Sequence, residues 1–167
     1  YIGGTVDFTL EAGRESSDMT SNVHSVADDA PFDALRALGA ESGAADRAVR
    51  AALAEAGASP GDPVLAIGHS GGGVIAAGLA ADPELNVVAG VNLGGPVASA
   101  PIPPGVPFLS LEHAEDLVPA TGGSGGPDGR APDMLVISRD VLDPGSDGDE
   151  LLPAHSLTRY QETGDLL

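Results

Sequence analysis

Residues 63–79, PVLAIGHSGGGVIAAGL, place a serine between an apolar strand pattern and a helical pattern of small residues. Residues 68–72 match G-x-S-x-G, the motif in which a nucleophilic serine sits on a sharp strand-to-helix turn. Backbone strain at such a turn requires neighbours without a Cβ atom, and Gly68 and Gly72 meet that requirement. The helix that follows would point its free N–H groups at whatever Ser70 attacks. This stretch therefore predicts an α/β fold organised around an activated serine.

The pentapeptide alone has two weaker interpretations. A chain with 24 glycines can form a glycine-rich turn whose serine merely caps the next helix. A phosphate-binding loop is excluded more firmly, because GHSGGG lacks the lysine of the G-x-x-x-x-G-K-[ST] motif and does not have G-x-G-x-x-G spacing.

Apolar runs alternate with helical patterns along the rest of the chain, which is typical of a parallel sheet covered by helices. We expect strands at 1–2, 64–67, 87–91, 106–111 and 134–137, and helices at 43–56, 73–81 and 154–163. The predicted fold is an α/β three-layer sandwich, with a mostly parallel sheet of about five strands and helices on both faces. Residues 1–167 form one domain in this interpretation. Because Tyr1-Ile2 resembles the end of a strand, we expect the first strands of a longer protein to be missing.

Charge and composition exclude several classes of function. A net charge of −18 disfavours binding to nucleic acid or to anionic membrane surfaces. The chain has no cysteine, so neither a thiolate nucleophile nor a cysteine-ligated metal is available. No run of 18 apolar residues predicts a membrane span, and no H-E-x-x-H or paired-histidine spacing predicts a metal. Localisation and oligomeric state are left open by the sequence.

A serine hydroxyl becomes a good nucleophile when a base accepts its proton, and that base is usually a histidine oriented by a carboxylate. Of the four histidines, His69 adjoins the serine on a strained turn that should point its side chain away, and His24 lies in an earlier polar segment. His155 follows the last predicted strand and is the preferred base, with His113 as its competitor.

Ser70, the acidic segment 112–116 and His155 all follow predicted strands, and they occur in the order serine, acid, histidine. With these motifs the chain resembles the α/β-hydrolase superfamily, and more narrowly the small, lidless serine hydrolases of actinobacteria. The residues that carry the resemblance are YIGGT at 1–5, GHSGGG at 68–73, EHAEDLVP at 112–119 and AHSLTRY at 154–160. These motifs extend over almost the whole chain.

The resemblance implies cleavage of an ester or thioester with Ser70 as the nucleophile. In this family the acid commonly lies in a D-x-V-P segment after a strand, and Asp116 begins such a segment. Glu112 and Glu115 are rival acids, each with the alternative of being a solvated surface carboxylate.

The resemblance also implies an oxyanion hole. One N–H should come from Gly71, the residue after the nucleophile, and a second from Thr5, with Gly4 as the alternative. The competing interpretation of the Gly3-Gly4 pair is a simple tight turn. The chain departs from the family pattern in lacking at least two early strands.

Three functions remain from this reasoning. The first is a cofactor-free serine hydrolase whose partner is a small-molecule ester or a lipid-like substrate. The second is a non-catalytic α/β binding module, against which the complete set of three candidate residues argues. The third is acyl transfer to an acceptor other than water.

Overall fold

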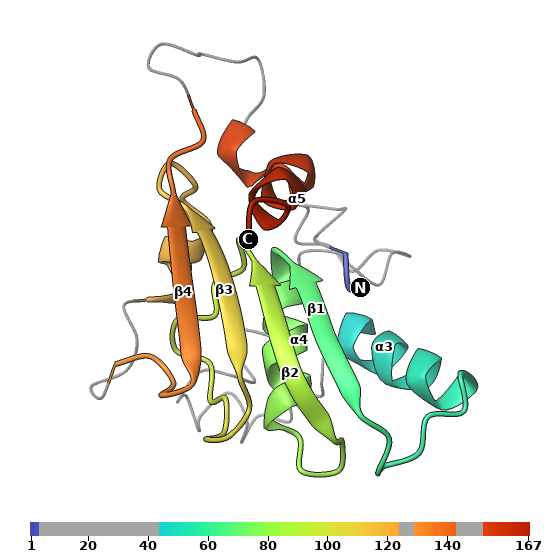
Figure 1. The fold of residues 1–167 in the computed structure, drawn as a ribbon. Coiled ribbons are helices and arrows are strands. Elements are labelled where there is room, and N and C mark those ends of the chain that lie inside the picture. Colours follow the sequence, from blue (N-terminus) through green and yellow to red (C-terminus); the bar gives the residue numbers. More distant parts are fainter. Residues whose placement is uncertain (4–43, 124–128, 143–151) are drawn as a thin grey trace, which may run out of the picture.

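The computed structural model describes residues 1–3, 44–123, 129–142 and 152–167 (Figure 1). The elements in chain order are α3 (Ala44–Glu55), β1 (Val64–His69), α4 (Gly71–Ala81), β2 (Val87–Leu93), β3 (Phe108–His113), the 3-10 turn η1 (Pro119–Gly122), β4 (Met134–Arg139), the 3-10 turn η2 (Pro153–His155) and α5 (Leu157–Gly164). Each described strand and α-helix overlaps a segment where the sequence pattern predicted one, whereas the 3-10 turn η1 was not predicted.

The four strands form one parallel sheet in the order β1-β2-β3-β4, which confirms the predicted α/β class. The predicted strand at 1–2 is present only as an isolated parallel bridge between Ile2 and Gly68, so the described sheet has four strands rather than about five.

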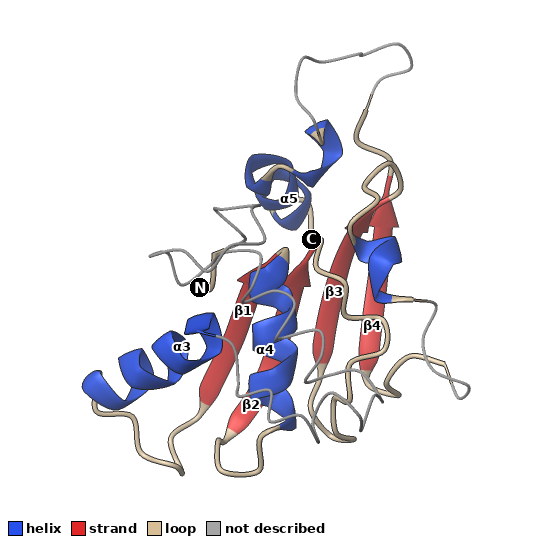
Figure 2. Cartoon of the chain, turned by 180° about the vertical axis from the view of Figure 1, so that it is seen from behind, coloured by secondary structure: helices blue, strands red, loops and turns tan. Residues whose placement is uncertain are grey.

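Helix α4 packs along one face of the sheet, behind β1 and β2 in Figure 1 and in front of them in Figure 2. Its small side chains allow a close approach, and Ala76 and Ala77 are completely buried. The core cluster consists of Ala66, Val74, Ile75, Ala76, Ala77, Leu79, Ala80, Val87, Val97, Ile102 and Phe108. Helix α3 is joined to the end of α4 by an ion pair between Arg50 and Asp82.

The opposite face of the sheet is less covered. Leu65 of β1 and Leu135 of β4 both point to this side and are 57% and 62% exposed. No helix in the described part of the chain lies along it, although α5 sits over the carboxyl ends of the strands (Figure 1). The described residues thus show two layers, and the third predicted layer stays a prediction.

The carboxyl ends of the strands lie at one edge, below α5 and η2 (Figure 1). Parallel strands present their chain continuations at the same edge, so segments far apart in sequence meet there. Among the helices that the structure describes, none combines the length and apolar character needed to cross a bilayer.

Candidate active site

Ser70 occupies a strained turn between β1 and α4. Its backbone angles are φ 55° and ψ −125°, and it is the one non-glycine residue with positive φ among the described residues. A Cβ atom at Gly68 would overlap the Gly72 carbonyl, and one at Gly72 would lie 2.6 Å from the Gly3 carbonyl oxygen. The turn therefore needs glycine at both positions. The Ser70 side chain makes no capping hydrogen bond to α4, so the helix-cap interpretation does not describe its role.

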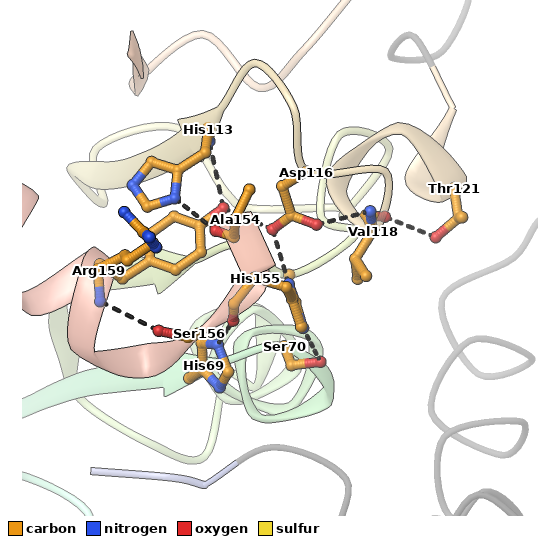
Figure 3. A network of polar contacts seen from close by, with 12 residues as sticks. His69, Ser70, His113, Asp116, Val118, Thr121, Ala154, His155, Ser156 and Arg159 are labelled. Carbon is orange, nitrogen blue, oxygen red and sulfur yellow. Dashed lines mark hydrogen bonds and ion pairs between the residues drawn. The ribbon is translucent and has the colours of Figure 1, made fainter. Parts of the chain in front are cut away.

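His155 contacts the serine hydroxyl directly. Its Nε2 lies 2.9 Å from the Ser70 Oγ, and its Nδ1 lies 2.6 Å from Oδ2 of Asp116 (Figure 3). The three side chains come from the ends of β1 and β3 and from η2, over a span of 85 residues between Ser70 and His155. The His155 side chain is 14% exposed and the Asp116 side chain is fully buried.

Asp116 is held as a carboxylate by its hydrogen bonds. Burial would raise its pKa, but donors from His155, the Val118 N–H and Tyr160 outweigh burial and lower the pKa below the ordinary value. An ionised carboxylate only accepts hydrogen bonds, so the proton of a neutral His155 must be on Nδ1. Nε2 then carries the lone pair, and the Ser70 hydroxyl donates to it. This is the arrangement that a general base requires.

The competing histidines have other partners. His113 is buried, with Nδ1 2.6 Å from the Ala154 carbonyl oxygen and Nε2 2.9 Å from the Thr163 hydroxyl. His69 Nε2 donates to the backbone carbonyl of His155 at 2.9 Å. Burial lowers the pKa of His69. Both side chains hold the segment that carries His155, and the contact with Ser70 belongs to His155.

The rival acids are also occupied elsewhere. Glu112 forms an ion pair with Arg130, with contacts of 2.6 and 3.2 Å. The carboxylate of Glu115 accepts from the backbone N–H groups of Val141 and Leu142 at 3.2 Å. The structure thus brings Asp116, and neither glutamate, to His155.

The expected oxyanion hole is described only in part. Gly71 is the first residue of α4, directly after Ser70. Thr5 and its alternative Gly4 lie outside the described residues, as does His24. The backbone of Ile2 and Gly3 lies against Gly72, near the start of α4.

Tyr160 was not singled out from the sequence. Its hydroxyl donates to Oδ2 of Asp116 at 2.7 Å, and its side chain is completely buried. The sequence offered a partial indication, because Tyr160 and Thr163 are spaced to lie on one face of the last helix. Nothing local, however, identifies the carboxylate that this face contacts.

No protein-family model, no curated protein and no solved structure gives a significant match to this chain. The assignment of a function therefore depends on the site itself. In residues 1–3, 44–123, 129–142 and 152–167, no cluster of three or more histidine and acidic side chains is placed to hold a metal ion.

Proposed function

We propose that this chain is a serine hydrolase of the α/β-hydrolase type that cleaves carboxylic esters or thioesters. The observation that carries the proposal is the contact chain from the Ser70 hydroxyl to His155 and on to Asp116, at 2.9 and 2.6 Å. The strained Ser70 backbone supports it, because strain of this kind persists where a side chain must be presented to a substrate.

In the proposed reaction the Ser70 Oγ attacks the acyl carbon while its proton passes to Nε2 of His155. Asp116 stabilises the imidazolium that forms. The carbon–oxygen bond to the leaving group then breaks, and the leaving group takes the proton from His155. Water, activated by the same histidine, releases the acid and restores the serine. For a thioester the carbon–sulfur bond breaks instead.

The N–H of Gly71 is the first donor proposed for the developing oxyanion, with the second supplied by the segment after Gly3, where Thr5 and Gly4 are the candidates. A third layer on the open face of the sheet belongs to the same proposal, since it would complete the three-layer sandwich of that fold.

Turnover of short-chain p-nitrophenyl esters and of an acyl thioester tests the proposal. Ser70→Ala and His155→Ala should each reduce kcat/KM by roughly 10³-fold or more. Ser59→Ala, at an exposed turn serine, is the matched control and should leave it unchanged. A folded wild-type protein that binds esters without turnover would support a binding module instead. Product that appears only with an added alcohol or thiol acceptor would indicate acyl transfer.

A further inference from the structure

We propose that Tyr160 is a positioning residue of this site, whose hydroxyl shares the Asp116 oxygen with His155 and limits how strongly the carboxylate holds the imidazolium. The inference rests on the proposed function and adds a fourth side chain to it. Tyr160 touches neither the serine nor the reacting atoms, and it acts through Asp116.

The direction of the hydrogen bond is fixed by the neighbouring groups. The backbone N–H of His113 lies 3.2 Å from the Tyr160 oxygen and can only donate, so the hydroxyl accepts from it. The hydroxyl proton is then free to point at Oδ2 of Asp116, 2.7 Å away. Because that carboxylate is an acceptor, the hydroxyl donates.

The ring is held in one place. It stacks on the His113 ring with centroids 3.8 Å apart and planes 8° apart. It also fills the space beside Gly94, where a Cβ atom would lie 2.6 Å from the ring. The Tyr160 oxygen therefore cannot move to another partner unless α5 also moves.

Two donors on a single oxygen compete for the same negative charge. His155 Nδ1 lies 2.6 Å from Oδ2 and the Tyr160 hydroxyl lies 2.7 Å from it, while the Val118 N–H lies 3.0 Å from Oδ1. A donor that neutralises part of the charge on a carboxylate weakens its attraction for a neighbouring cation. Removing the Tyr160 hydroxyl, and with it this donor, should therefore stabilise protonated His155.

His155, the proposed base, and Tyr160, which acts on Asp116, lie in a single short segment. His155 ends η2, and Tyr160 lies five positions later in α5. The titratable groups around the tyrosine hydroxyl are Asp116, His155, His69, His113 and Glu112.

The pH dependence of kcat/KM for Tyr160→Phe tests the inference. The variant keeps the ring and loses the donor, so the acid-side midpoint should rise by about half to one pH unit. Thr163→Val is the matched control, since it removes another buried hydroxyl of α5, one that contacts His113 and not Asp116. That control should retain the wild-type midpoint.

A second measurement keeps a phenol hydroxyl at position 160. The chain has two tyrosines, so Tyr1→Phe, at an exposed position, leaves Tyr160 as the sole tyrosine. Biosynthetic replacement of tyrosine by 3-fluorotyrosine in this variant makes the hydroxyl a stronger donor at nearly constant size. The acid-side midpoint should then move in the opposite direction, to lower pH.

Equal midpoints in the wild-type, phenylalanine and fluorotyrosine proteins would overturn the inference while an active wild type left the proposed function standing. A wild-type protein without turnover would instead overturn the proposed function, and this inference with it.

Discussion

At the scale of single residues, the partners of each histidine decide its role. His155 contacts Ser70 and Asp116, whereas His69 and His113 bind the consecutive carbonyls of His155 and Ala154. Two histidines thus hold the backbone of the segment that presents the third. Sequence reasoning preferred His155 from its place after the last strand, but the supporting contacts of the other two were not predicted.

The proposed role of Asp116 as the acid gives a prediction at the same scale. Asp116→Asn should lower kcat by roughly 10³–10⁴-fold, because His155 loses the acceptor that fixes its tautomer. Glu112→Gln and Glu115→Gln are matched controls and should have small effects, since neither carboxylate reaches His155 in the structure. Steady-state kinetics on one ester substrate measures all three. A crippling effect of either glutamine variant, with a mild effect of Asp116→Asn, would assign the acid to that glutamate.

At the scale of elements, the turn between β1 and α4 places Ser70, the proposed nucleophile. Its geometry depends on backbone packing without side chains, at Gly68 against Gly72 and at Gly72 against Ile2 and Gly3. The serine sits at the point where the strand hydrogen bonds end and the helix begins. A motif of five residues predicted this element well, because the contact between Gly68 and Gly72 lies within the motif, whereas the contact with Ile2 and Gly3 does not.

Two glycines of α4 should therefore respond in opposite ways to alanine. Gly72→Ala would bring a Cβ atom against the backbone of Ile2 and Gly3, so the N-terminal segment must move, and we expect loss of ester turnover. Gly78→Ala meets nothing within 4 Å and should stabilise the helix by roughly 0.5–1 kcal/mol. Thermal unfolding and turnover of the two variants provide the measurement. Full turnover in Gly72→Ala would contradict the tight approach.

At the scale of the whole molecule, the α/β class and the positions of the four described strands could be predicted, because alternating apolar runs reflect local burial. Among the described residues the sheet has one strand fewer than predicted, since Ile2 contributes one bridge rather than a strand. Tyr160, His69 and His113 gain their roles only through contacts between segments distant in sequence, and no local pattern encodes such contacts. Sequence reasoning placed helices on both sides of the sheet, and a helix on the face around Leu65 and Leu135 stays a prediction, because no helix among the described residues covers that face.

Stability should depend on pH through His69. Burial lowers its folded-state pKa from the ordinary 6.5, so the unfolded chain takes up a proton first as the pH falls. The contribution of His69 to the free energy of unfolding is complete above about pH 6.5. It is lost as the pH falls through the lowered folded-state pKa of His69. His69→Gln should remove that part of the dependence, while Asp116, whose pKa is lowered from 3.8, acts only in a more acidic range. Urea unfolding at a series of pH values tests this. Equal slopes for the two proteins below pH 6.5 would contradict it.

The central claim is that Ser70 is an activated nucleophile, and labelling with a fluorophosphonate probe followed by peptide mapping tests it most directly. The account predicts one modified hydroxyl, that of Ser70, with no labelling of Ser70→Ala and much slower labelling of His155→Ala. Modification of a different residue, or no modification of a folded sample that turns over esters, would contradict the claim.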